Sequence, residues 1–366
     1  MIEKVKISPH QFKLIVILVY IGSSILVIPG ILASEVKQDA WISALLGILF
    51  GLLLVWLYNS LGDKFGNMTL VEYSEKILGK WIGKLISLFF VMFLFINCST
   101  LIYIFGNFIT TEILTETPIQ FTNIIFIAVI IMGTRYGLET FAKASEILYP
   151  LVLVLLIMLL IFLCKDIDLK NIQPVFEYEI KHIVKGSLLY VSYSSLTLVA
   201  LMMIFPAYVN NKKEAKKSFL IGTLTGGIII FFLTFFVISV LDPNIAALNE
   251  YSTFTLAKKI NVGKFLERLE AIVTLLWFIT IFYKTIIYFY GIVFGLAQIL
   301  KLKDYKPLTL PSGILVVIFS LIIYPNSSYA NKWNSTTWVS FALTSGFFIP
   351  LLLLLVGKIR KIKNKY

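Results

Sequence analysis

Charge is scarce in this sequence: Asp, Glu, Lys and Arg together make up only 14% of the 366 residues. Soluble domains carry about 25% charged residues. Hydrophobic residues account for 58% of the chain, more than a soluble fold could cover, so lipid must form part of the solvent. This shortage of charge excludes an ordinary soluble domain and predicts an integral membrane protein.

Cysteine and histidine are scarcer still, with two of each. Cys98 lies inside an apolar run and Cys164 at the end of another, which is neither a disulfide framework nor a metal signature. His10 and His182 lie in a terminal segment and a loop, without paired metal-ligand spacing. The sequence also lacks a Walker-type phosphate loop and a nucleophile elbow. We therefore expect no metal, no cofactor and no catalytic residues, and do not expect an enzyme.

The net charge of +12 comes from residues in the gaps between apolar stretches, which indicates membrane topology rather than nucleic-acid binding. A helix needs near twenty apolar residues to cross about 30 Å of hydrocarbon. Long polar or Ser/Gly-rich linkers are missing, so we predict a single polytopic domain, 1–366, with an uncleaved first span. The ten runs that predict spans are 12–33, 41–58, 85–111, 121–133, 147–163, 187–208, 218–241, 271–299, 311–324 and 337–357; the fourth and ninth are short.

Positive charge predicts the direction of the chain through the membrane. With the N-terminus inside, 21 of the 32 Lys and Arg residues fall in cytoplasmic segments, including the basic tail 358–366. Because positive charge favours the cytoplasmic side, we predict that both termini are cytoplasmic.

Two gaps between the runs predict helices of their own. Thr69 and Glu72 form a capping box, so a short helix is expected to begin there and to stop at Gly79. The external segment 242–270 alternates apolar and charged residues, which is typical of amphipathic helices lying over the external mouth. A solvated loop without a gating role is the alternative.

The first run carries residues that disfavour a continuous helix, namely Gly22, Ser23 and Ser24, followed by Pro29 and Gly30. Glycine adds backbone freedom, and proline removes a donor and clashes with the preceding turn. Unwound backbone at membrane depth marks the substrate site of many transporters. We predict a functional helix break at Gly22, Pro29 and Gly30; an ordinary proline kink is the alternative.

A five-plus-five division of the runs would give two repeats, 12–163 and 187–357. The counterpart of the first run is then the sixth, which is rich in hydroxyl groups that can satisfy freed backbone groups. The second and seventh runs each carry a GxxxG motif, and a third lies at Gly291 and Gly295. Such motifs mean close helix packing.

Lys284 lies deep in the eighth run, roughly 20 Å along a helix from either flanking charge. A buried ionisable residue is costly unless it faces a cavity or a partner. The partner could be a substrate carboxylate or carbonyls of a broken helix, or the amine could be neutral. We hypothesise that Lys284 holds a cation-like position, contacting ligand or replacing a coupling ion.

The chain resembles the GerAB-type spore germination permeases, the B subunits of endospore germinant receptors, in the amino acid–polyamine–organocation transporter superfamily. The resemblance runs nearly end to end. The pieces that carry it are Ile21-Gly22-Ser23-Ser24 leading to Pro29, Glu72-Tyr73, Leu78-Gly79-Lys80-Trp81-Ile82-Gly83, Thr117-Pro118-Ile119-Gln120, Asn171-Ile172-Gln173-Pro174-Val175, Phe205-Pro206, and Glu267-Arg268-Leu269-Glu270 with Trp277.

This resemblance implies an all-α fold of ten transmembrane helices, a LeuT/APC-like five-plus-five inverted repeat with helices 1 and 6 broken. It implies a protein of the spore inner membrane that binds a small nutrient germinant, with an amino acid as the expected ligand, and works with A and C subunits. The ligand-binding residues that it implies are Gly22, Ser23, Ser24, Asn97, Thr100, Tyr103, Tyr193, Ser194, Ser195, Thr197, Tyr283 and Lys284.

Two positions depart from the pattern expected of relatives. Lys284 stands where a neutral hydroxyl residue is expected, and Ala200 where some relatives carry an acid. Three functions share the implied fold: a ligand sensor within a receptor, an amino-acid permease coupled to protons, and a germinant-gated conduit for water or ions.

Overall fold

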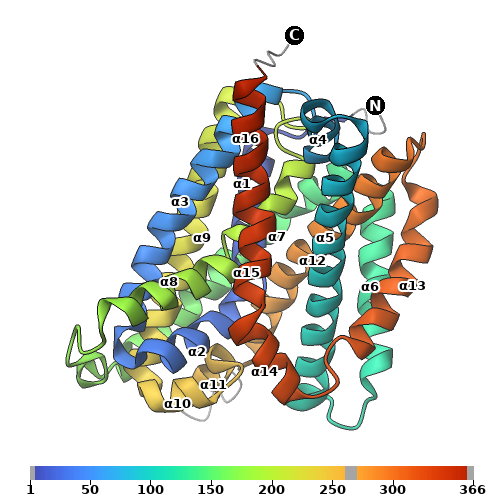
Figure 1. The fold of residues 1–366 in the computed structure, drawn as a ribbon. Helices are drawn as coiled ribbons and strands as arrows, with labels where there is room; N and C mark the ends of the chain where they lie inside the picture. The colour runs from blue at the N-terminus through green and yellow to red at the C-terminus, as the bar shows by residue number, and fades with distance from the viewer. Residues whose placement is uncertain (1–4, 260–269, 361–366) are drawn as a thin grey trace.

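The computed structural model describes residues 5–259 and 270–360, and within them the chain is helical, with one isolated bridge between Ile7 and Val209 (Figure 1). The α-helices in chain order are α1 (Pro9–Ile21), α2 (Ser24–Val36), α3 (Ala40–Phe65), α4 (Leu70–Leu78), α5 (Lys80–Phe108), α6 (Ile119–Tyr136), α7 (Leu138–Leu163), α8 (Ile180–Tyr193), α9 (Lys212–Leu241), α10 (Pro243–Leu248), α11 (Ser252–Lys259), α12 (Glu270–Leu300), α13 (Thr309–Ile322), α14 (Ser327–Thr336), α15 (Trp338–Leu343) and α16 (Ile349–Ile359).

Short turns of other helical types continue several of these elements. The 3₁₀ segments are η1 (Lys37–Asp39), η3 (Cys164–Asp166), η4 (Leu169–Ile172), η5 (Leu196–Met203) and η7 (Lys306–Leu308), and the π segments are η2 (Ile109–Ile113) and η8 (Thr344–Phe348).

Eight helical stretches of the described residues are long and apolar enough to cross a membrane. One of them, Ser24–Lys64, contains both α2 and α3, whereas Pro9–Ile21 and Lys306–Ile322 are apolar but shorter. The short fourth run corresponds to a helix of sufficient length, Ile119–Tyr136. The membrane-spanning character of the chain is thus evident, and the count of ten spans stays a prediction.

The helix that the capping box predicts is confirmed. The Thr69 side chain accepts from the Glu72 amide and the Glu72 carboxylate accepts from the Thr69 amide, and together they start α4. Gly79 ends α4 with a φ of +87°, a value that glycine adopts at little cost. Arg360, after the end of α16, donates a hydrogen bond to the Ile77 carbonyl at 2.6 Å, so α4 also anchors the last helix.

The GxxxG motif of α3 lies against the second broken helix. A Cβ at Gly47 would lie 2.7 Å from Cγ of Tyr190, and one at Gly51 would collide with the Ser195 hydroxyl. Only a residue without a side chain lets the two helices approach this closely.

The GxxxG motif of α9 has the same relation to the first broken helix. A Cβ at Gly222 would lie 2.8 Å from Cβ of Val16, and one at Gly226 would lie 2.8 Å from Cβ of Tyr20. The second run (α3) therefore packs on the sixth (α8 and the turn after it), and the seventh (α9) packs on the first (α1). This is the reciprocal contact expected of two related halves.

The helices form two groups. In one group, which we call the bundle, α1, α2, α3, α8 and α9 pack on one another. In the other, which we call the frame, α5, α6, α12 and α13 do so. In the frame, α12 approaches α5 through Gly291 and Gly295, whose missing side chains admit Leu94 and Val91. The two groups also meet directly, because α1 of the bundle packs on α12 of the frame.

α10 and α11 pack on α2 at the end of the molecule opposite to the start of α1 and the end of α16 (Figure 1). The helices predicted in 242–270 are therefore present up to Lys259, and residues 260–269 lie outside the described part. Since α1 begins and α16 ends at the same end of the molecule, both termini approach one face. That this face is cytoplasmic stays a prediction.

Candidate functional site

The first broken helix is interrupted at Gly22 and Ser23, between α1 and α2. Gly22 has a φ of +23°, in the region that favours glycine. A Cβ there would also lie 2.9 Å from Cβ of Lys284. The glycine therefore serves both the turn of the chain and the close approach of the lysine stem.

The prediction that Pro29 and Gly30 belong to the break is wrong, because α2 continues through both to Val36. Pro29 has no N–H to donate to the Ile25 carbonyl four residues earlier. The Thr253 hydroxyl of α11 donates to that carbonyl instead, at 2.6 Å. At Gly30 the chain needs glycine for packing, since a Cβ would lie 2.8 Å from the Asn249 carbonyl oxygen.

The second break follows α8, which ends at Tyr193. Ser194 and Ser195 form a turn, and the chain resumes as the 3₁₀ segment η5. The Ser194 hydroxyl donates to the Tyr190 carbonyl, and the Thr197 hydroxyl to the Ser194 carbonyl, both at 2.8 Å. The Thr197 hydroxyl thus satisfies a carbonyl of the turn that a continuous helix would have satisfied with an amide, whereas the Tyr190 carbonyl also keeps its bond from the Ser194 amide.

Lys284 connects the two breaks. Its Nζ donates to the Ser23 hydroxyl at 3.2 Å and to the Tyr193 carbonyl at 2.7 Å. The side chain is buried, at the fifteenth of the 31 residues of α12. Among the residues that the structure describes, none of the ion pairs involves Lys284. The structure therefore shows one of the alternatives considered for Lys284: it contacts a carbonyl and a hydroxyl of the broken helices.

A cavity of about 740 Å³ opens from this junction between bundle and frame. It extends along α2, α5 and α8 to the connection between α10 and α11. The predicted site residues that line it are Ser23, Asn97, Thr100, Tyr103, Tyr193, Thr197 and Lys284.

The other predicted site residues lie elsewhere. Tyr283 points to α7, where its hydroxyl donates to the Phe141 carbonyl at 3.1 Å; it faces away because it is adjacent to Lys284 on a helix. Ser24 donates to the Tyr193 carbonyl at 3.3 Å, and Ser195 to the Tyr20 hydroxyl at 3.3 Å. Ser24 and Ser195, with Gly22 and Ser194, shape the breaks without lining the cavity.

Several lining residues were missed from sequence, among them Tyr288, Tyr324, Trp338 and Glu250. Tyr288 follows Lys284 by four residues and so shares its helix face, a signal that could have identified it. Trp338 and Tyr193 pack with ring centroids 5.5 Å apart and ring planes tilted by 45°. The Tyr193 hydroxyl and Trp338 Nε1 are buried and have no hydrogen-bond partner among the described residues.

The outer end of the cavity carries both acidic and basic side chains. Glu35 of α2 contacts Lys185 of α8 at 2.7 Å and His182 Nδ1 at 3.0 Å. Glu250 lies between α10 and α11, and burial raises the pKa of its carboxyl. Both carboxylates of the cavity, Glu35 and Glu250, thus lie at its outer end, whereas Lys284 lies at its inner end.

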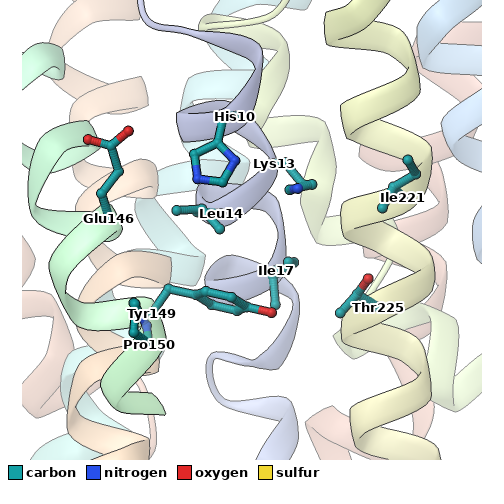
Figure 2. Close-up of a pocket in the computed structure, with 9 residues that line it drawn as sticks. All are labelled: His10, Lys13, Leu14, Ile17, Glu146, Tyr149, Pro150, Ile221 and Thr225. Carbon is teal, nitrogen blue, oxygen red and sulfur yellow. The ribbon is translucent and has the colours of Figure 1, made fainter. Parts of the chain in front are cut away.

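A second, smaller pocket of about 260 Å³ lies at the opposite end of the molecule. Figure 2 shows His10 and Lys13 of α1 facing a space shared with Glu146 and Tyr149 of α7. The opposite wall is α9, through Thr225. This pocket involves neither helix break, so it is the weaker candidate for a ligand site.

Comparison with known proteins links this geometry to a family. Residues 6–328 match the family described as "Spore germination protein". Spore germination protein KB of Bacillus subtilis (strain 168) is 30% identical, over 99% of this chain and 98% of its own length. Spore germination protein YndE of the same organism is 25% identical, over 97% of each chain.

Two solved structures share the fold at low sequence identity. MhsT in complex with L-phenylalanine aligns with a TM-score of 0.68 and 14% identity, over 97% of this chain and 99% of that one. Mhp1, a nucleobase-cation-symport-1 family transporter with bromovinylhydantoin bound, aligns with a TM-score of 0.63 and 12% identity, over 98% and 91%. The fold is therefore that of LeuT-like transporters, as predicted.

Proposed function

Because this chain belongs to the family of spore germination proteins, we propose that it is the B subunit of a nutrient germinant receptor, binding a small germinant in the 740 Å³ cavity. The germinant is an amino acid, and its binding triggers germination together with A and C subunits. The protein lies in the spore inner membrane with both termini in the cytoplasm.

One observation carries this proposal: the cavity ends where both broken helices meet, at Ser23 and Tyr193. A ligand there would contact bundle and frame at once, so that its binding could shift one against the other. Differential contact with two arrangements is what a ligand needs in order to switch a protein. The polar groups of Asn97, Thr100 and Tyr103 on one face of α5 complete the wall.

The proposal predicts that narrowing the cavity weakens the response of spores to one nutrient. Spores lacking this chain would lose germination with a particular amino acid, and the wild-type chain would restore it. Thr100→Phe, which fills the cavity, would require at least about tenfold more amino acid, the equivalent of roughly 1.4 kcal/mol. Thr140→Phe, at an exposed position of α7, would restore the response fully. Unchanged germination of the deletion strain with every nutrient would contradict the proposal.

An amino-acid permease coupled to an ion gradient is the second candidate. The likeness to MhsT in complex with L-phenylalanine and to a cation symporter favours it. Uptake of labelled amino acids by the reconstituted chain distinguishes the two. Saturable uptake driven by a proton gradient would support the permease, whereas binding without uptake would support the sensor.

A further inference from the structure

The backbone carbonyls at the second break are already occupied by donors of the chain itself. The Tyr193 carbonyl accepts from Lys284 Nζ at 2.7 Å and from the Ser24 hydroxyl at 3.3 Å, with the Thr197 hydroxyl also 3.3 Å away. A carbonyl oxygen has two lone pairs, so these donors saturate it. The Ser194 carbonyl accepts from Thr197 at 2.8 Å. A ligand ammonium would have to displace one of these donors.

Lys284, in contrast, keeps a hydrogen-bond donor at the same place. An ammonium has three N–H groups, and Lys284 uses two of them, for Ser23 and Tyr193. The Trp338 Nε1 and the Tyr193 hydroxyl also have no partner among the described residues, but both atoms are fully buried. All of these side chains line the cavity. The inner end therefore suits a group that accepts hydrogen bonds.

Among the described residues, none of the ion pairs supplies a carboxylate to the Lys284 ammonium. Glu35, one of the acidic residues of the cavity wall, lies eleven residues beyond Ser24 on α2, about 16 Å along the helix, and it pairs with Lys185. Glu250 lies next to Asn249, which approaches Gly30 rather than Ser23. A buried ammonium without a carboxylate favours an anionic partner.

We propose that Lys284 binds the carboxylate of the ligand, in competition with the Tyr193 carbonyl, and that its ammonium replaces a separate sodium ion. Carbonyls at helix breaks coordinate such ions in many transporters, and here an ammonium holds that place between frame and bundle. When a carboxylate binds, the bond of Lys284 to Tyr193 is exchanged for an ion pair, which loosens the connection of α12 to α8. This inference rests on the proposed function and adds the chemistry of the ligand.

The test compares acids with their carboxamides on the purified full-length protein in detergent. Each of the twenty common amino acids is titrated by isothermal calorimetry, and each one that binds is compared with its carboxamide. We expect the carboxamide to bind about 10- to 100-fold more weakly, the range that loss of one charge-assisted hydrogen bond gives. Replacing sodium chloride by choline chloride should leave the affinity unchanged.

Variants of Lys284 test the assignment to this residue. Lys284→Met is expected to remove the difference between acid and carboxamide, and Lys284→Arg to keep it. Lys143→Met, which removes an exposed lysine of α7, is the matched control and should bind as the wild type does. The comparison of acid and carboxamide on the wild type needs no variant, so it can overturn the inference even where Lys284→Met fails to fold.

Three results would overturn the inference while the proposed function stands. They are equal affinity for acid and carboxamide, affinity that falls more than tenfold without sodium, and an unaltered preference for the acid in Lys284→Met. If none of the amino acids bound the wild type or germinated spores that carry it, the proposed function would fail, and the inference with it.

Discussion

The two broken helices reach the same junction by different chemistry. At the first, a single glycine with a φ of +23° interrupts the helix, and the chain resumes as an α-helix. At the second, paired serines turn the chain, and it resumes as a 3₁₀ helix; the hydroxyls of Ser194 and Thr197 donate to carbonyls of α8 and of the turn. The first break depends on backbone freedom and on the absence of a side chain, the second on side-chain donors. The first should therefore tolerate substitution less well.

Gly22→Ala is expected to have the largest effect. A positive φ costs an alanine about 1–2 kcal/mol, and the contact with Lys284 adds about 1–3 kcal/mol. The measurement is thermal unfolding of the full-length protein in detergent. Gly79→Ala is the control, because Gly79 also has a positive φ but no atom within 4 Å of the added Cβ. Equal losses in the two variants would contradict a packing role for Gly22.

Thr253→Val is expected to have an intermediate effect, because it leaves the Ile25 carbonyl without the donor that compensates for Pro29. A buried unsatisfied group costs about 1–3 kcal/mol. In a Pro29→Ala background, the new amide can supply the bond, and Thr253→Val should then cost less. A double-mutant cycle by thermal unfolding measures this coupling. Additive losses would show that Thr253 does not serve the carbonyl freed by proline.

Ser194→Ala is expected to have the smallest effect, about 0.5–1.5 kcal/mol for one hydrogen bond, because it removes a single donor to the Tyr190 carbonyl. The readout is again the thermal unfolding midpoint, with Thr140→Val as an exposed control on α7. A loss as large as that of Gly22→Ala would mean that the second break is as dependent on one residue as the first.

Local signals predicted local structure well. The capping box at Thr69 and the glycine at 79 are close in sequence to the helix that they delimit, and α4 has those ends. Gly22 likewise marks its break because the cause, a positive φ, lies in the residue itself. The glycine motifs of α3 and α9 indicated close helix packing, since small residues determine how closely helices approach. In the structure α3 packs on the second broken helix and α9 on the first.

Features that depend on distant partners could not be predicted. Pro29 was predicted to belong to the helix break, and the donor that lets α2 continue is Thr253, 228 residues after Ile25. The contacts of Lys284 stayed open among three alternatives because nothing in its neighbourhood in sequence places the Tyr193 carbonyl beside it. Trp338 and Tyr324 line the cavity from the last third of the chain, and no pattern in their own segments indicates it.

The depth of Lys284 has an electrical consequence. Halfway along α12, this residue lies within the field of a charged membrane. Moving one elementary charge fully across 100 mV is worth about 2.3 kcal/mol, so carrying an anion halfway is worth roughly 1 kcal/mol, or about fivefold in affinity. A zwitterion brings no net charge to that depth. Voltage would therefore bias the occupancy of the cavity by a simple carboxylate ion and leave its occupancy by an amino acid unchanged.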